Sequence, residues 1–287
     1  MSIQVSNLSH TYNKGLPGEQ IALSHVSFDI FDGEIVGIIG HTGSGKSTLL
    51  QHMNGLVKPD EGRIIVGGID ITKPHVAMQE IRKRVGLVFQ YPEYQLFEET
   101  VELDVAFGPR NLGLSEDEIA ERVRTSLELV GLDYEEVRER SPFELSGGQR
   151  RRVAIAGVVA MRPQVLILDE PTAGLDPESH REIIQMIRQI HEAENNITIF
   201  VSHNMDDVAN LADKVLVMDH GKLVTVDSPE NVFVQKPRLE LLGLSCPEAT
   251  EFLFRLKAEG IPVRTDMFTR EACAEEIFRY LQEKKES

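Results

Sequence analysis

The nine residues from Gly40 to Thr48, which read G-H-T-G-S-G-K-S-T, constrain the fold of this chain more than any other stretch. They follow the apolar run Ile35 to Ile39 and lead into Leu49 to Met53, which is typical of the start of a helix. A strand, a glycine-rich loop and a helix, in that order, form the context that a phosphate-binding loop needs. The sequence therefore predicts an α/β domain that is built around a nucleotide site.

The residue types of this loop suit the binding of phosphate groups. Gly40, Gly43 and Gly45 let the backbone turn tightly, so that successive N–H groups point inward toward phosphate oxygens. The N-terminus of the following helix adds a partial positive charge at the same place. Lys46 can reach the terminal phosphates, and the Ser47 hydroxyl can bind Mg²⁺. We expect the other loop residues to line the same site: His41, Thr42, Ser44 and Thr48.

Three further apolar runs are followed by polar residues; the runs are residues 84–89, 165–168 and 197–202. They end at Gln90, at Asp169-Glu170 and at His203. Apolar strands separated by helical patterns predict a parallel sheet that is covered on both faces. Because ligands of such sheets lie beyond the carboxyl ends of the strands, we expect these residues to meet the phosphate-binding loop. Two adjacent carboxylates suit a magnesium nucleotide site, in which one holds the metal and the next polarises the attacking water.

The regions around this core differ in their patterns. Residues 1–33 alternate in short stretches and predict antiparallel strands that flank the core, with another short strand at residues 62–68. Tyr12, in the first region, could stack on an adenine ring or simply pack on the surface. A helical subdomain is predicted at about residues 91–161, where Ser115 and Glu118 match a capping box. From about residue 236 the chain predicts a small helical accessory domain, so the expected domains are residues 1–235 and 236–287.

The motif L-S-G-G-Q at residues 145–149 predicts a second anion-binding helix start. Ser146 is suited to cap the helix, and Gly147, Gly148 and Gln149 follow it with exposed backbone N–H groups. The helical block stands between this motif and the phosphate-binding loop, so one chain cannot easily bring them together. Two chains facing head to tail can do so. A plain capped helix is the alternative interpretation.

Charge and composition restrict the class of partner. The net charge is −16, from 46 acidic and 30 basic residues. This argues against a nucleic-acid-binding face and against adhesion to anionic lipid, both of which need basic clusters. The sequence shows no secretory signal and no apolar run near the roughly 18 residues that span a bilayer. Cys246 and Cys273 have no metal-ligand companions, so we expect reduced thiols in a cytoplasmic protein whose membrane contacts go through protein partners.

The order of the motifs in this chain resembles that of the ATPases of the ABC transporter family. These motifs are the phosphate-binding loop, Gln90, L-S-G-G-Q, Asp169-Glu170, A-G-L-D at residues 173–176 and His203. The resemblance covers residues from about 1 to 235. It implies a P-loop NTPase fold, with ATP and Mg²⁺ as cofactors. Under it, Glu170 is the general base and His203 is a switch near the γ-phosphate. The metal site would comprise Ser47, Gln90 and Asp169.

The same resemblance implies that the active unit is a dimer. Ser146 to Gln149 would grip the nucleotide that is bound to the opposite subunit, and Asp176 would lie at the interface between subunits. Asp176-Pro177 also reads as a helix N-cap followed by proline at the first helical position, and both roles are compatible.

Within that family, three segments are similar to those of the ATPases of energy-coupling factor transporters. They are Q-Y-P-E-Y-Q-L-F at residues 90–97, Thr100-Val101, and F-G-P-R-N at residues 107–111. These importers take up vitamins and transition-metal ions, and two ATPases drive a membrane T-component that carries a substrate-binding S-component. Residues 90–97 would contact the coupling helices of the T-component, or else only pack the helical subdomain. The chain would then lie peripherally on the cytoplasmic face of the cell membrane. Other ABC importers or exporters, and soluble ABC ATPases acting on DNA or ribosomes, are the alternatives.

Overall fold

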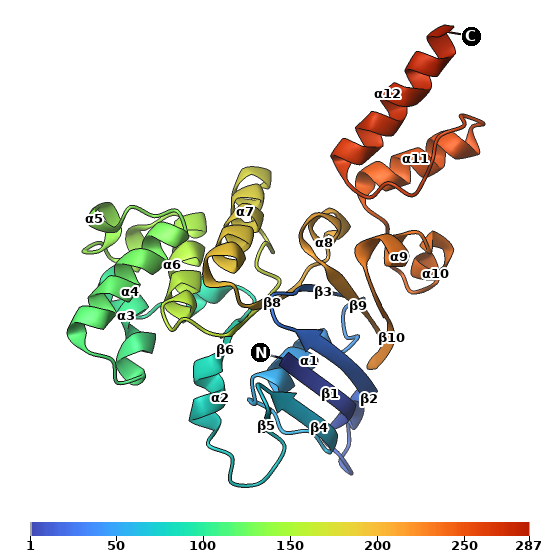
Figure 1. Ribbon diagram of the computed structural model, residues 1–287. Coiled ribbons are helices and arrows are strands. Elements are labelled where there is room, and N and C mark those ends of the chain that lie inside the picture. The colour runs from blue at the N-terminus through green and yellow to red at the C-terminus, as the bar shows by residue number, and fades with distance from the viewer. Residues whose placement is uncertain (1, 287) are drawn as a thin grey trace.

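A six-stranded sheet forms the centre of the protein, which is described by a computed structural model over residues 2–286. Its strand order is β10-β9-β3-β8-β7-β6; all neighbours are parallel except β10, which pairs antiparallel with β9. The strands are β3 (Ile35–Ile39), β6 (Val85–Val88), β7 (Val165–Asp169), β8 (Ile197–Val201), β9 (Lys214–Asp219) and β10 (Lys222–Asp227). The apolar runs of the sequence are thus confirmed as neighbouring strands of one parallel sheet (Figure 1).

Side chains from the two faces of this sheet enter two different hydrophobic cores. Ile35 and Ile39 of β3 pack into the core beneath the helices, whereas Val36 and Ile38 pack into the core shared with the N-terminal strands. This alternation follows from the two-residue period of a strand. Because both faces are covered, the central strands are apolar along their whole length.

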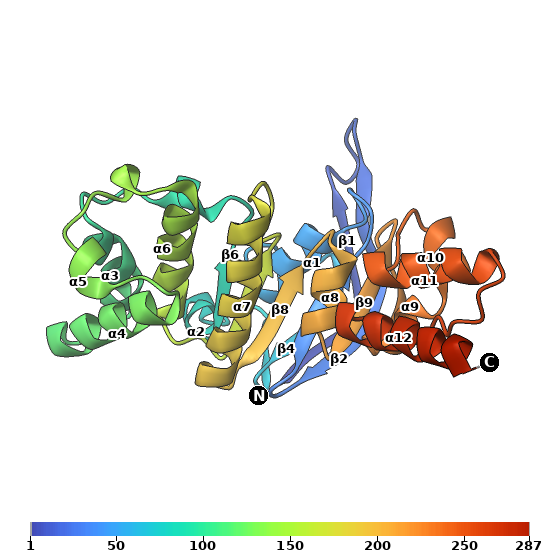
Figure 2. The same cartoon turned by 90° about the horizontal axis from the view of Figure 1, so that it is seen from above.

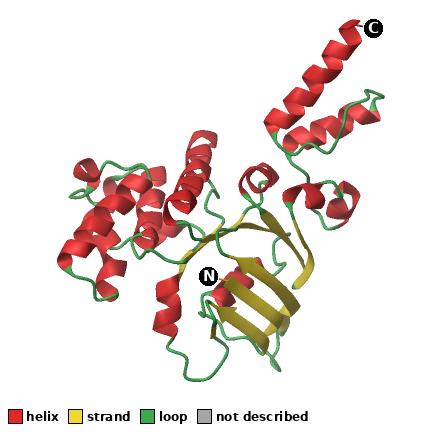
Figure 3. Cartoon of the chain, in the orientation of Figure 1, coloured by secondary structure: helices red, strands yellow, loops and turns green. Residues whose placement is uncertain are grey.

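An antiparallel sheet of order β2-β1-β4-β5 covers one face of the nucleotide core. Its strands are β1 (Ser2–Tyr12), β2 (Gln20–Phe31), β4 (Glu61–Val66) and β5 (Ile69–Asp70). Helix α1 (Lys46–Met53) contacts β2 and β4 on one side and β7 on the other, so it lies between the two sheets (Figure 3). The predicted antiparallel N-terminal strands are confirmed.

A block of helices projects from one end of the core sheet (Figure 2). It follows α2 (Met78–Arg84), and its elements are η1 (Pro92–Gln95), α3 (Val101–Asn111), α4 (Glu116–Leu129), α5 (Tyr134–Val137), η2 (Pro142–Glu144) and α6 (Gly147–Val159). The predicted capping box opens α4, since the Ser115 hydroxyl accepts from the Glu118 N–H and the Glu118 carboxylate accepts from the Ser115 N–H. Among the described residues, no helix is long and apolar enough to cross a membrane.

The remaining helices follow the sheet strands and then form the C-terminal region. They are α7 (Pro177–Glu194), α8 (Met205–Leu211), α9 (Pro229–Phe233), α10 (Lys236–Leu241), α11 (Glu248–Ala258) and α12 (Arg270–Glu286). Leu239 and Cys246 belong to the large helical core, whereas Leu253, Val263 and Cys273 form a small core of their own. Both cysteines are buried and free. Phe268, however, packs into the large core near Phe233, so the region after Cys246 has a small core of its own and is also joined to the large one. The domain boundary at residue 236 stays a prediction.

Candidate nucleotide site

The phosphate-binding loop follows β3 directly and ends where α1 begins, as the sequence predicts. Gly45 is the residue before the helix and adopts a φ of 101°, and a Cβ there would lie 2.5 Å from the carbonyl oxygen of Ala22. At Gly40 a Cβ would lie 2.4 Å from the carbonyl oxygen of Met218. Only glycine allows the loop to approach β2 and β9 this closely. These contacts fix the shape of the loop from outside.

Lys46 points back into the loop. Its Nζ donates to the carbonyl oxygens of Gly40, at 2.7 Å, and His41, at 3.0 Å. Burial lowers the pKa of the Lys46 ammonium group, and the negative charges of Glu170 and Asp169 act in the opposite direction. The ammonium group therefore lies within the loop, where phosphate oxygens can take the place of the carbonyl partners.

A pocket of about 260 Å³ opens in front of the loop. It is lined by Thr42, Gly43, Gly45, Lys46, Ser47 and Thr48 of the loop and α1, by Tyr12, Gln20 and Ala22 of the antiparallel sheet, and by Gln90, Glu170 and His203. The carboxyl ends of three parallel strands thus deliver their polar residues to the pocket, as predicted. Two predicted loop residues, His41 and Ser44, do not line the pocket. The His41 side chain is directed toward Asp219, and Ser44 is buried.

Tyr12 stands at the rim of this pocket, where its hydroxyl lies 3.3 Å from the Thr48 hydroxyl. It is partly exposed, and its position suits an aromatic ring that stacks on a base. Gln20 and Ala22 were missed by sequence reasoning. The register of the first hairpin pairs Tyr12 with Gln20, so a correct pairing of β1 and β2 would have identified Gln20.

Glu170 is held by two side chains from neighbouring strand ends. Gln90 Nε2 donates to its Oε2 at 2.7 Å, and His203 Nε2 lies 2.8 Å from its Oε1. Because a carboxylate oxygen only accepts, His203 carries its proton on Nε2. The three predicted residues are therefore brought together, and the carboxylate has a defined orientation beside the phosphate-binding loop.

Asp169 lies at the end of β7, one residue before Glu170, and is buried. Burial raises the pKa of its carboxyl group, the hydrogen bond from the Ser47 hydroxyl opposes this, and the charge of Glu170 raises the pKa further. The Oε1 atom of Gln90 remains available, because the amide uses its nitrogen toward Glu170. A carboxylate, a hydroxyl and an amide oxygen form a donor set that fits Mg²⁺.

The L-S-G-G-Q motif opens α6 with the predicted cap. The Ser146 hydroxyl accepts from the Gln149 N–H at 3.2 Å, and the Gln149 side chain accepts from the Ser146 N–H at 3.1 Å. Asp176 likewise caps α7, accepting from the N–H groups of Glu178 and Ser179 at 3.0 Å each. Among the described residues, those lining the nucleotide pocket include neither this motif nor Asp176. The starts of α6 and α7 therefore contribute no residue to the lining of that pocket in their own chain.

Arg151, on α6, connects three parts of the site and was missed by sequence reasoning. Its guanidinium group forms a two-pronged ion pair with Glu93, at 3.0 and 2.8 Å, in the segment after Gln90. It also donates to the carbonyl oxygens of Pro171, at 3.1 Å, and Ala173, at 2.7 Å, just after Glu170. The only signal in the sequence was the middle position of the run R-R-R at residues 150–152, where a buried arginine cannot be told from its half-buried neighbours.

Comparisons with known proteins agree with this geometry. The family described as ABC transporter matches residues 23–173. The Energy-coupling factor transporter ATP-binding protein EcfA2 of Caldanaerobacter subterraneus subsp. tengcongensis is 56% identical over 282 residues, which cover 98% of each chain. The protein of the same description from Clostridium tetani is 55% identical over 284 residues, which cover 99% of each chain.

The fold has solved counterparts. The structure of cbiO1 from Clostridium perfringens, described as part of the ABC transporter complex cbiONQ, matches with a TM-score of 0.74 and 38% identity. That match covers 83% of this chain and 94% of the other. A dimeric ATP-binding cassette in a post-hydrolysis state with ADP and Pi matches with a TM-score of 0.70 and 28% identity, over 79% of this chain and 98% of the other. The chain therefore belongs to the ABC transporter family and, within it, to the energy-coupling factor transporter ATP-binding proteins.

Proposed function

We propose that this chain is the ATP-binding and ATP-hydrolysing subunit of an energy-coupling factor importer. The observation that carries the proposal is the Glu170 carboxylate, which Gln90 and His203 hold beside the phosphate-binding loop. Such a carboxylate is suited to accept a proton from water next to a terminal phosphate. Identity above one half with two EcfA2 proteins supports the transporter class.

In the proposed binding mode, the phosphates lie on the loop N–H groups and on Lys46, and Tyr12 stacks on the base. Ser47, Asp169 and Gln90 would hold Mg²⁺, which when bound would neutralise charge on the phosphates. Asp169 and Ser47 are already in contact, so this part of the metal site needs little rearrangement.

In the proposed hydrolytic step, Glu170 accepts the proton of the attacking water. Its Oε2 is engaged by the Gln90 amide in the structure, whereas its Oε1 is engaged by His203. Each carboxylate oxygen has more than one acceptor site, so Oε2 can accept a proton while Gln90 still donates to it. His203 keeps the carboxylate oriented through Oε1 while this happens. Gln90 would thus orient the base with its amide N–H, while its Oε1 would be free to hold the metal ion.

We propose that a second ATPase completes the site. The starts of α6 and α7 carry Ser146 to Gln149 and Asp176 on a surface away from their own pocket. Facing a second cassette head to tail, these helix starts would contact the nucleotide of that cassette. The second ATPase is either a further copy of this chain or a paralogue, and the dimeric cassette structure supports such pairing.

A groove between α2, η1, α3 and α6 is the proposed contact with the membrane T-component. It has a volume of about 500 Å³. At its edge Phe97 and Phe107 pack edge to face with ring centroids 5.0 Å apart, yet they remain 57% and 46% exposed. The helical subdomain itself therefore does not cover this aromatic pair. A coupling helix with an apolar face would bury it. The S-component, which selects a vitamin or metal ion, would be carried by the T-component, and this chain would be peripheral on the cytoplasmic side.

Purification of the tagged chain from its native membranes in mild detergent tests this assignment. Mass spectrometry should identify a second ABC ATPase or further copies of this chain, one T-like membrane protein and small S-like proteins. Recovery of ribosomal or DNA-repair proteins without membrane proteins would refute transport, and a conventional two-permease complex would move the chain to another ABC subfamily. Phe107→Asp should reduce recovery of the T-like protein at least tenfold. Phe31→Asp, which changes an even more exposed phenylalanine on β2, should not.

A further inference from the structure

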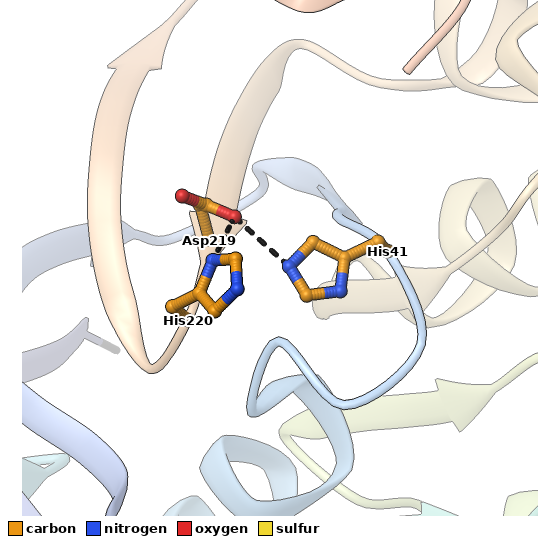
Figure 4. A group of neighbouring side chains, drawn as sticks. All are labelled: His41, Asp219 and His220. Atoms are coloured by element: carbon orange, nitrogen blue, oxygen red, sulfur yellow. Dashed lines mark hydrogen bonds and ion pairs between the residues drawn. The ribbon is translucent and has the colours of Figure 1, made fainter. Parts of the chain in front are cut away.

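Three side chains next to the phosphate-binding loop form a cluster that the proposed ATPase reaction does not use. His41 is the second residue of the loop, Asp219 ends β9, and His220 begins the turn to β10 (Figure 4). His41 Nε2 lies 2.9 Å and His220 Nδ1 lies 2.7 Å from the same carboxylate oxygen, Asp219 Oδ1. One ligand atom from each residue lies within 4.8 Å of the others.

The hydrogen bonds of His41 require a positive charge at this place. Its Nδ1 lies 2.8 Å from the carbonyl oxygen of Thr42, and because a carbonyl oxygen only accepts, Nδ1 must carry a hydrogen. In a neutral imidazole, Nε2 then carries a lone pair, which would face the carboxylate oxygen of Asp219. Two acceptors at this distance repel each other. The arrangement is favourable only if the ring carries a second proton or if a cation binds between the two atoms.

The surroundings favour a cation in three ways. A ring nitrogen that donates to a backbone carbonyl is the usual support of a metal-bound histidine, because it fixes the tautomer and the ring orientation. Asp219 Oδ1 lies within 2.9 Å of a nitrogen of each ring, so the carboxylate already faces the place where the ion would bind. His41 and Asp219 are 30% and 26% exposed, so two ligands are held in place while the third, His220, is 80% exposed and can adapt.

We propose that His41 Nε2, the Asp219 carboxylate and His220 Nδ1 bind a divalent transition-metal ion of the zinc type. Two imidazoles and one carboxylate, with water in the fourth position, are a common ligand set for Zn²⁺, Co²⁺ and Ni²⁺, whereas Mg²⁺ prefers oxygen ligands. In a tetrahedral site with bonds of about 2.0–2.1 Å, ligand atoms lie about 3.4 Å apart. From their distances of 2.9 and 2.7 Å, the two ring nitrogens would therefore need to move away from the carboxylate oxygen by only about 0.5 and about 0.7 Å.

Such an ion would join the phosphate-binding loop to the β9–β10 turn. These two segments already share a hydrogen bond, from the Gly221 N–H to the Ser44 carbonyl oxygen at 3.0 Å. The metal would add a side-chain link at the other end of the loop. The site is separate from the proposed Mg²⁺ ligands, and its test does not depend on ATP hydrolysis or on membrane partners.

The test is a titration of the purified full-length chain with Co²⁺ alone, after treatment with a chelator, without nucleotide and with Mg²⁺ in excess. We expect one equivalent to bind and to produce visible d–d absorption bands without thiolate-to-cobalt charge transfer, followed by displacement by Zn²⁺. His220→Ala and Asp219→Asn should each weaken binding at least tenfold. The control variant His75→Ala, which removes an exposed histidine outside the cluster, should bind Co²⁺ with the affinity of the unsubstituted protein. Melting curves without metal show that each variant is folded.

Three results would overturn the proposal. Equal affinity in the unchanged protein and in both folded variants, or a charge-transfer band from Cys246 or Cys273, would place the ion elsewhere. Absence of binding at micromolar Co²⁺ and Zn²⁺ would mean that His41 instead carries a second proton.

Discussion

Glu170 has a strained backbone and a firmly held side chain. Its φ is +50°, in the left-handed region that a residue with a side chain rarely adopts. Such a conformation costs about 1–3 kcal/mol and persists where the surroundings impose it. Here β7 fixes the residue before it, and Gln90 and His203 hold its carboxylate. The turn directs the side chain back over the end of the sheet, toward the phosphate-binding loop.

Replacing Glu170 by Gln tests its role as the base. The amide keeps the shape of the side chain but cannot accept a proton, so turnover should fall roughly 100-fold or more. The affinity for MgATP should stay within a few-fold, because the loop is untouched. Steady-state phosphate release and binding of a fluorescent ATP analogue measure the two quantities. Glu192→Gln, an exposed position near the other end of α7, is the matched control, and near-normal hydrolysis by Glu170→Gln would contradict the assignment.

Lys46→Ala should instead weaken nucleotide binding itself. The ammonium group already has its donors directed into the loop, and hydrogen bonds to a charged group contribute about 1.5–3 kcal/mol. The dissociation constant for MgATP should therefore rise roughly 10- to 100-fold. Lys58→Ala removes an exposed lysine as a control. An unchanged dissociation constant for Lys46→Ala, measured by equilibrium binding, would refute the phosphate-binding role of the loop.

At the scale of elements, Arg151 joins α6 to the ends of two core strands. Through Glu93 it holds the segment that follows β6, and through Pro171 and Ala173 it holds the segment that follows β7. Movements of the helical subdomain therefore reach Gln90 and Glu170 through one buried guanidinium group. The ring of Tyr91, 5.7 Å from that group, packs on the same connection.

Arg151→Met should destabilise the protein by about 3 kcal/mol at pH 7, because it leaves Glu93 without its partner in a largely buried position. Burial raises the pKa of Glu93, but the hydrogen bonds from Arg151 outweigh it, so the pKa in the folded protein is lowered. The stabilisation is therefore present above the ordinary glutamate pKa of about 4.3 and is lost as the pH falls through the folded value. The difference in free energy of unfolding between the two proteins should shrink below about pH 4.

Urea denaturation at several pH values measures this difference. The control is Arg152→Met, at a more exposed ion pair, which should lower the free energy of unfolding by less than about 1 kcal/mol. Equal destabilisation by both variants would contradict the argument.

The elements that the sequence predicted are those set by local patterns. The apolar runs of β3, β7 and β8 and the caps at Ser115, Ser146 and Asp176 depend on residues close to one another in the chain. The β9–β10 turn was not predicted, and its contacts with the phosphate-binding loop join residues nearly 180 positions apart. Arg151 and Gln20 were missed for the same reason, because their roles are set by tertiary packing that no local pattern records.

At the scale of the whole molecule, the two halves of the proposed active site point to different places. The pocket with Lys46 and Glu170 is lined by residues of both sheets and of the phosphate-binding loop. Helix α6 belongs instead to the helical block (Figures 1 and 2). The proposed active unit is therefore a pair of cassettes, and association must precede hydrolysis.

The MgATPase activity per chain should accordingly rise with the concentration of the purified protein. At low concentration most chains are single and lack the second half-site, so mass action limits the active fraction. Phosphate release across a 100-fold range of chain concentration measures this. At Gly148 an added Cβ would make only an ordinary contact with Ser179, so the chain should tolerate a side chain there. The Gly148→Arg variant should still bind MgATP yet stay inactive at every concentration. Activity per chain that is independent of concentration would refute the composite site.

The proposed head-to-tail pairing also has a genetic consequence. Under it, a lesion in the phosphate-binding loop would disable the site that binds this chain's own nucleotide, whereas a lesion in L-S-G-G-Q would disable the site on the neighbouring subunit. Where both subunits are copies of this chain, a cell carrying one allele of each kind would assemble some pairs with one undamaged site. Two alleles that are each null alone would then complement, although both lie in the same gene.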